Sequence, residues 1–216
     1  HVPEAIAQCC EKKVPVATIF SDGFAETGAE GRAKQEELLQ VARANGLRLL
    51  GPNCIGLMDL HSHLVLSVNA VLEHAQIKAG ATAIVSQSGS MMGALMSRGL
   101  GRGTGFSKLV SVGNESDLAV GEITDMLVDD ADTRIILLFM ETLRDAERLA
   151  HAARRAYAAG KPVVVYKLGR SEVGVELASS HAGAMTGSDD TADAFFRAHG
   201  MLRVDLLETL FELPAL

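Results

Sequence analysis

The sequence predicts an α/β fold organised around a doubly wound parallel sheet. From Gly80 onward, five short apolar runs alternate with helix-like patterns, and this alternation is typical of parallel strands joined by helical crossovers. Only 4% of the residues are aromatic while Gly occurs 21 times, which suits helices that pack closely on a parallel sheet. The hydrophobic fraction of 48% and the charged fraction of 22% are those of a globular chain rather than a disordered one.

The residues before this regular part predict a smaller α/β segment. A helix is expected from Val2, a buried strand over 14–20, a helix over 31–45 and a second strand over 47–50. No strand pattern precedes the first helix. We therefore expect the chain to begin inside a domain whose opening strand lies before His1.

Residues 61–79 are expected to connect the two parts. Their periodicity is weak, and they predict either an irregular connector or a hairpin with arms over 64–68 and 76–78.

The regular part predicts its elements in strict alternation. A long loop over 168–187 interrupts the pattern between the fourth strand and the helix that follows it. The expected strands cover 81–86, 106–112, 134–140, 162–167 and 201–204, and the expected helices cover 90–99, 118–127, 146–159, 190–199 and 206–213.

Charge and composition exclude several function classes. The formal net charge of −7 argues against a nucleic-acid-binding surface, which needs clustered Lys and Arg. No signal-peptide pattern and no run of about 18 apolar residues occurs, so no membrane segment is expected. Cys9, Cys10 and Cys54 form no disulfide framework, and no Cys/His spacing resembles a zinc site. These observations predict a reduced, cytoplasmic protein without a metal site.

Two turns at the carboxyl ends of predicted strands contain small polar residues. Ligands of doubly wound sheets bind at this edge, where helix N-termini offer free N–H groups. We expect Ser88 and Gly89 in the first turn, and Gly113 and Asn114 in the second, to bind phosphate. The alternative for each turn is simple capping of the helix that follows.

Two further residues predict phosphoryl chemistry. Glu141 directly follows an apolar strand, where its carboxylate either faces the site or caps the next helix. His181 stands among Ser, Gly, Ala and Thr in the long loop, with Ser180 and Gly183 beside it. We expect His181 to carry a phosphoryl group that Ser180 and Gly183 help to bind. Glu141 would hold the other ring nitrogen of the histidine.

Taken together, these segments resemble the NDP-forming acyl-CoA synthetases, a superfamily that includes ADP-forming acetyl-CoA synthetase and the α subunit of succinyl-CoA synthetase. The segments that carry the resemblance cover nearly the whole chain. They are Gly23-Phe24-Ala25-Glu26-Thr27-Gly28, Gly51-Pro52-Asn53-Cys54-Ile55-Gly56, Ser86-Gln87-Ser88-Gly89, Gly113-Asn114, Lys161-Pro162 and Ser180-His181-Ala182-Gly183-Ala184.

The resemblance implies two domains and their ligands. Residues 1–60 would be the C-terminal half of a Rossmann-type CoA-binding domain, residues 61–79 a connector, and residues 80–216 a flavodoxin-like domain with the phosphohistidine loop. His181 matches the phosphorylated histidine of the family, and Glu141 the carboxylate that orients it. The residues implied at the CoA arm are Gly23, Phe24, Glu26, Asn53 and Cys54.

The resemblance also implies an activity. Acyl-CoA, phosphate and ADP or GDP would be interconverted with the free acid, CoA and ATP or GTP, through an acyl phosphate and a phosphohistidine. The nucleotide and Mg²⁺ would bind an ATP-grasp domain or a β-type partner subunit, in an oligomer. The alternatives are a CoA-binding regulatory module of an acetyltransferase fusion and a nucleotide-independent acyl-transfer accessory protein.

Overall fold

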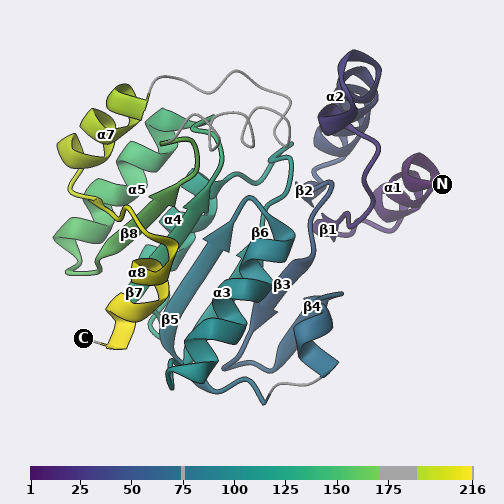
Figure 1. The fold of residues 1–216 in the computed structure, drawn as a ribbon. Coiled ribbons are helices and arrows are strands. Elements are labelled where there is room, and N and C mark those ends of the chain that lie inside the picture. Colours follow the sequence, from purple (N-terminus) through teal and green to yellow (C-terminus); the bar gives the residue numbers. More distant parts are fainter. Residues whose placement is uncertain (74–75, 171–188, 216) are drawn as a thin grey trace.

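The computed structural model describes residues 1–73, 76–170 and 189–215. Within them the strands form two sheets, one of two strands and one of seven (Figure 1). No helix in these ranges is both long enough and apolar enough to span a membrane.

The five predicted strands of the regular part are present, and all pair in parallel. Their order in space is β6-β5-β7-β8-β9, which is the flavodoxin-like order, and its direction reverses between β5 and β7. The parallel sheet is therefore confirmed. The strands are β5 (Ala79–Ser86), β6 (Phe106–Ser111), β7 (Ile135–Met140), β8 (Val163–Lys167) and β9 (Leu202–Arg203).

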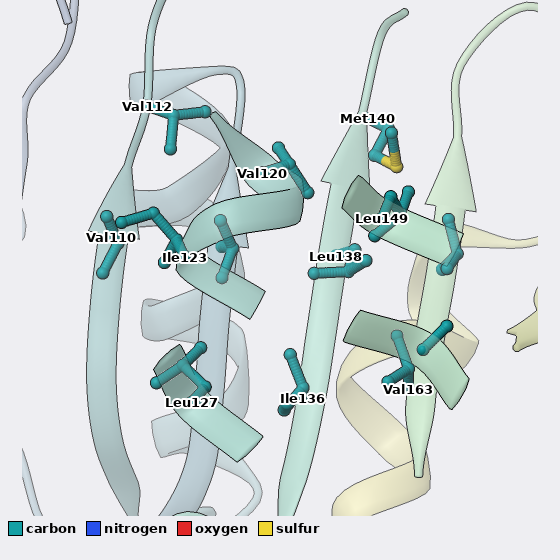
Figure 2. Packing of buried hydrophobic residues seen from close by; sticks show 14 of the residues in the cluster. Val110, Val112, Val120, Ile123, Leu127, Ile136, Leu138, Met140, Leu149 and Val163 are labelled. Atoms are coloured by element: carbon teal, nitrogen blue, oxygen red, sulfur yellow. The ribbon is translucent and has the colours of Figure 1, made fainter. Parts of the chain in front are cut away.

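Helices cover both faces of this sheet (Figure 1). On one face pack α4 (Val120–Asp129), α5 (Ala146–Ala158) and α7 (Asp189–Ala198), and on the other α3 (Gly89–Gly101) and α8 (Leu207–Glu212). The alternation of side chains along each strand supplies both cores. On the central strand β7, the side chains that meet α4 and α5 are those of Ile136, Leu138 and Met140 (Figure 2), while Leu137 and Phe139 belong to the opposite core.

Two further strands extend the sheet on its other side, and only the second was anticipated, as the 64–68 arm of the expected hairpin. β3 (Gly56–Asp59) pairs antiparallel with β6 and with β4 (Leu64–Ser67), so the whole sheet is mixed. The expected hairpin between 64–68 and 76–78 is wrong, because the partner of β4 is β3. β3 lacks the β-branched run that marks a buried strand, since its four residues are Gly-Leu-Met-Asp. β4 and the short helix η2 (Ala70–Glu73) lie in the range expected to be a connector.

The N-terminal part follows the predicted order of elements. Its strands β1 (Val16–Thr18) and β2 (Arg48–Leu50) pair in parallel. Its helices are α1 (Val2–Glu11), the short η1 (Ala25–Thr27) and α2 (Ala29–Ala44). A separate small core, with Ile6, Leu38, Leu47 and Leu49 at its centre, holds them together.

Backbone hydrogen bonds join this part to the turn that follows β6. The N–H groups of Asn114 and Ser116 donate to the carbonyls of Pro52 (2.9 Å) and Gly51 (3.1 Å), and the N–H of Leu118 donates to Leu49 (3.1 Å). The turn after β2 is thereby placed at the carboxyl edge of the larger sheet.

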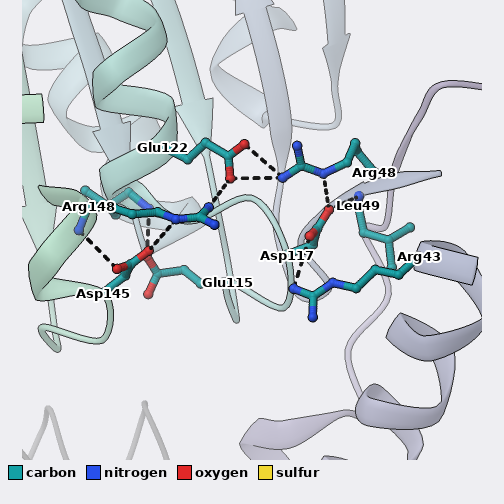
Figure 3. A network of polar contacts seen from close by, with 9 residues as sticks. Arg43, Arg48, Leu49, Glu115, Asp117, Glu122, Asp145 and Arg148 are labelled. Carbon is teal, nitrogen blue, oxygen red and sulfur yellow. Dashed lines mark hydrogen bonds and ion pairs between the residues drawn. The ribbon is translucent and has the colours of Figure 1, made fainter. Parts of the chain in front are cut away.

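A polar network reinforces the same junction (Figure 3). Arg48 donates to Asp117 at 2.7 Å and to both carboxylate oxygens of Glu122 at 2.9 Å. Arg148 reaches Glu122 from α5 at 2.6 Å, and Arg43 lies 3.4 Å from Asp117. Burial alone would raise the pKa of Asp117, but hydrogen bonds from Arg48, from the N–H of Leu49 and from Arg43 lower it below its usual value. The network fixes how the two parts meet.

Candidate active site

A cavity of about 320 Å³ opens at the carboxyl edge of the sheet, where the strand order reverses between β5 and β7. Both parts of the chain line it. The lining residues include Phe20, Asn53, Cys54, Ile55, Gln87, Ser88, Gly89, Ser90, Gly113, Asn114, Glu141, Thr142 and Arg144. Most of the predicted site residues that the structure describes therefore line this one cavity.

The N-terminus of α3 forms one wall of this cavity. Ser88 is the N-cap, and its hydroxyl accepts the N–H of Met91 at 3.4 Å, as the capping interpretation predicts. A Cβ atom on Gly89 would lie 2.7 Å from Cγ2 of Ile55, so a residue without a side chain lets the turn approach the N-terminal part. The remaining free N–H groups and the positive helix end are suited to an anion, and phosphate binding by Ser88 and Gly89 stays a prediction.

Gln87 ties three turns of the edge together. Its Oε1 accepts the backbone N–H groups of Glu141 (2.6 Å) and Thr142 (2.9 Å). Its Nε2 donates to the carbonyl of Thr142 (2.9 Å) and to Oε2 of Glu115 (2.7 Å). These four contacts use both hydrogens of the amide and leave only one orientation of the side chain compatible with its partners.

Glu115, in the turn after β6, is a deeply buried carboxylate. Its Oε1 accepts the N–H of Val120 at 2.8 Å, and its Oε2 lies 3.8 Å from Nε of Arg144. Burial raises the pKa of Glu115, against the lowering effects of Val120, Arg144 and Gln87. Desolvation thus outweighs the nearby positive charge.

Gly113 and Asn114 have partners in the N-terminal part. Gly113 has φ of +57°, and a Cβ atom there would lie 2.2 Å from the carbonyl oxygen of Pro52. The side-chain amide of Asn114 donates to Glu26 and to Gln35 (3.1 Å), and its Oδ1 accepts from Asn53 at 3.3 Å. The structure therefore gives both residues a role in joining the two parts, and their expected contact with phosphate stays a prediction.

The residues expected at the CoA arm fall into two groups. Asn53 and Cys54 line the cavity, whereas Gly23 and Phe24 line a separate cavity next to α1 and α2. Glu26 links the groups, because it accepts the N–H groups of Gly23 (2.5 Å) and Phe24 (3.0 Å) and also the amide of Asn114. Burial alone would raise the pKa of Glu26, but these hydrogen bonds lower it.

Cys54 is placed as a buried packing residue. Its side chain is 3% exposed, and its thiol donates to the carbonyl of Ile19 at 3.3 Å. Burial raises the pKa of this thiol, which disfavours the nucleophilic thiolate.

Three predicted residues lie outside the described residues: His181, Ser180 and Gly183. Glu141, the expected partner of His181, lines the cavity. No group of three His, Cys, Asp or Glu side chains that could hold a metal ion occurs in the part of the chain that the structure describes.

Gln87, Glu115 and Arg144 were not identified as site residues from the sequence. Their contacts join turns that are far apart in the chain, so only the register of the parallel strands brings them together. For Arg144, the signal in the sequence was its place three residues after Glu141, just beyond the carboxyl end of β7.

Comparison with known proteins gives one consistent result. The model of the succinyl-CoA ligase like flavodoxin domain matches residues 79–216. Acetate–CoA ligase [ADP-forming] I of Archaeoglobus fulgidus is 36% identical over 215 residues, which are 100% of this chain and 31% of that protein. The α subunit of acetate–CoA ligase [ADP-forming] I of Pyrococcus furiosus is 36% identical over 98% of this chain and 45% of that subunit.

A solved structure agrees with these sequence relatives. It is that of Ca. Korarchaeum cryptofilum dinucleotide forming acetyl-coenzyme A synthetase 1 in complex with phosphate and ADP. It matches 99% of this chain and 45% of its own chain with a TM-score of 0.91 at 31% identity. The present chain thus spans less than half the length of these relatives.

Proposed function

This chain belongs to the family of succinyl-CoA ligase like flavodoxin domains, and on that basis we propose that it is the acyl- and phosphoryl-transfer part of an ADP-forming acyl-CoA synthetase. The single observation that carries the proposal is the cavity at the β5–β7 reversal. There, Asn53 and Cys54 of the N-terminal part meet Ser88, Gly89 and Glu141 of the flavodoxin-like part. A site that must bring CoA and phosphate together needs such a junction.

In the proposed reaction, an oxygen of inorganic phosphate attacks the thioester carbon of acyl-CoA, and CoA leaves as the thiol. A ring nitrogen of His181 then attacks the phosphorus of the acyl phosphate, the P–O bond to the acyl group breaks, and the acid leaves. Finally an oxygen of ADP takes the phosphoryl group and frees the histidine. The reverse sequence makes acyl-CoA.

We assign the chain's own residues to these steps by position. The N-terminus of α3, with Ser88 and Gly89, holds the phosphate through backbone N–H groups and the helix dipole. Glu141 accepts the N–H of the imidazole nitrogen of His181 that does not react, which fixes its tautomer. Asn53, Cys54 and the turn of Gly23, Phe24 and Glu26 border the CoA arm.

The nucleotide with its Mg²⁺ belongs, in this proposal, to an ATP-grasp domain or a β-type subunit. The described residues of this chain offer no donor set for the metal, so no step is assigned to it here. The lengths of the relatives, of which this chain matches 31% and 45%, support further domains or subunits. We place the complete oligomeric enzyme in the cytoplasm.

The test is ATP formation by the complete protein that contains this chain. With acetyl-CoA, inorganic phosphate, ADP and Mg²⁺, ATP and free CoA should appear in equal amounts, and omission of phosphate should abolish both. Binding of CoA without any phosphate-dependent ATP would instead favour the regulatory module. The names of the relatives, all ligases or synthetases, give that alternative no support.

A further inference from the structure

Arg144 is the one Lys or Arg among the described residues that line the cavity. The other lining side chains are uncharged, apart from the carboxylate of Glu141. A phosphate bound there would bring about two negative charges into a site that already holds one. The N-terminus of α3 supplies only about half a positive charge. Among the described lining residues, the side chain of Arg144 is therefore the main source of positive charge to balance a bound phosphate.

Two hydrogen bonds of the Arg144 guanidinium are to neutral acceptors. Its Nη1 donates to the backbone carbonyl of Asn114 at 2.7 Å, and its Nε donates to the hydroxyl of Thr142 at 3.1 Å. Both partners belong to turns at the carboxyl edge of the sheet. The side chain remains 33% exposed. These two hydrogen bonds hold the guanidinium at the wall of the cavity that it lines.

Glu115 approaches Arg144 from the protein interior, and it is the main alternative explanation for a cation at this position. The two groups are 3.8 Å apart, longer than a hydrogen bond, and the carboxylate accepts instead from Gln87 and Val120. Burial raises the pKa of Glu115 in spite of Arg144. The position of Arg144 is therefore not explained by a need to balance the charge of Glu115 alone.

We propose that Arg144 is an anion-binding residue of this site and contacts the phosphate that reacts at the α3 N-terminus. This inference rests on the proposed function and adds a residue to it. A planar guanidinium can bind two oxygens of one oxyanion. The carboxylate of the acid substrate shares this chemistry. We commit to phosphate because Arg144 lines the same cavity as Ser88 and Gly89 at the helix end.

The test measures the KM for inorganic phosphate in ATP formation by the complete protein. Arg144→Gln should raise this KM at least tenfold, because a charge-assisted hydrogen bond is lost, and should change the KM for ADP less than twofold. Arg144→Lys should recover part of the affinity. Arg154→Gln is the matched control, since Arg154 is an exposed arginine of α5 that contacts His199 and not the cavity. An unchanged KM for phosphate in Arg144→Gln would overturn the proposal.

A second measurement does not need turnover. Binding of inorganic phosphate, and separately of acetate, is measured by calorimetry for the unsubstituted protein, Arg144→Gln, Arg144→Lys and Arg154→Gln, with circular dichroism to check folding. We expect phosphate affinity to fall in Arg144→Gln and to recover partly in Arg144→Lys. Loss of acetate binding with unchanged phosphate binding would contradict the proposal. If no form makes ATP but phosphate binding still depends on Arg144, the proposed function fails while this inference stands.

Discussion

The side-chain oxygen of Gln87 accepts the backbone N–H of Glu141 at 2.6 Å, and this contact ties the turn after β5 to the turn after β7. Ser88 and Gly89 directly follow Gln87, so the helix end that is proposed to hold phosphate is fixed relative to the carboxylate proposed to orient His181. The two turns flank the point where the strand order reverses. The buried amide of Gln87 thus joins the two turns, in addition to the pairing of β5 with β7.

Replacing Gln87 with Met should reveal this coupling. Methionine has a similar length but leaves the N–H groups of Glu141 and Thr142 and one oxygen of Glu115 without their partner. We expect a loss of about 1–3 kcal/mol in the free energy of unfolding, measured by urea denaturation, and a lower kcat for ATP formation. Gln40→Met, at an exposed position of α2, should change stability by less than about 0.5 kcal/mol. Equal behaviour of the two variants would show that the amide does not fix the turns.

Gly113→Ala should weaken the junction between the two parts. The added Cβ would sit 2.2 Å from the carbonyl oxygen of Pro52 on a backbone with φ of +57°, so the turn at 51–53 must move. We expect a lower melting temperature and a loss of at least about 1 kcal/mol. Gly101→Ala in α3, where nothing lies within 4 Å of a Cβ atom, should be neutral or stabilising. A stable Gly113→Ala protein would contradict the described packing.

Asp117→Asn should destabilise the protein in a pH-dependent way. Burial alone would raise the pKa of Asp117, but Arg48, the Leu49 N–H and Arg43 lower it below its usual 3.8. A lowered carboxyl pKa gives stability that is complete well above pH 3.8 and is lost as the pH falls through the lower pKa of the folded state. The difference in unfolding free energy between wild type and variant should be about 1–3 kcal/mol at pH 7.

The check for Asp117 is a series of urea denaturations between pH 7 and pH 3. The difference between the two proteins should shrink as the pH falls toward 3. Asp129→Asn, whose carboxylate is 71% exposed, serves as the control and should show little effect at any pH. A difference that stays constant across the series would mean that the charge of Asp117 is not what stabilises the junction.

Cys54 should be the slowest cysteine to react. Its thiol is buried and its pKa is raised by burial, whereas Cys9 and Cys10 are half-buried on α1. Timed alkylation with iodoacetamide at pH 7.5, followed by peptide mass spectrometry, should label Cys9 or Cys10 before Cys54. Cys54→Ala should retain ATP formation. Fast labelling of Cys54, or inactivity of a folded Cys54→Ala protein, would point to a chemical role instead.

The sequence predicted the central parallel strands because they are buried on both faces and read as apolar runs, such as Ile135–Met140. The edge strand β9 is different, since it is short and its Leu202 is 55% exposed. The sequence did not predict β3, because Gly56–Asp59 is short and has one face only partly covered, with Met58 buried and Leu57 less so. The predicted pairing of β4 with 76–78 was wrong for a similar reason, because no local pattern marks an antiparallel strand added at the edge of a parallel sheet.

The site was predictable to the extent that it lies in turns after strands. Glu141 comes directly after a strand pattern, and Ser88 and Gly89 come within three residues of another, and the parallel register brings them to one cavity. The contacts of Gly113 and Asn114 with Pro52 and Glu26 depend on how two parts of the chain with separate cores meet. A chain pattern of 2.0 or 3.6 residues carries no information on such a junction. Gln87 and Arg144 were missed for a different reason, because their contacts join turns of the larger sheet that are far apart in the chain.

The phosphohistidine proposed at His181 can be detected by a labelling experiment. The complete protein is incubated with Mg²⁺ and ATP labelled with ³²P in the γ position, and the label is located by peptide mapping. We expect an acid-labile, base-stable label on His181, which the carboxylic acid substrate plus CoA should discharge, and no label in His181→Ala. Equal labelling of the His181→Ala protein would contradict it.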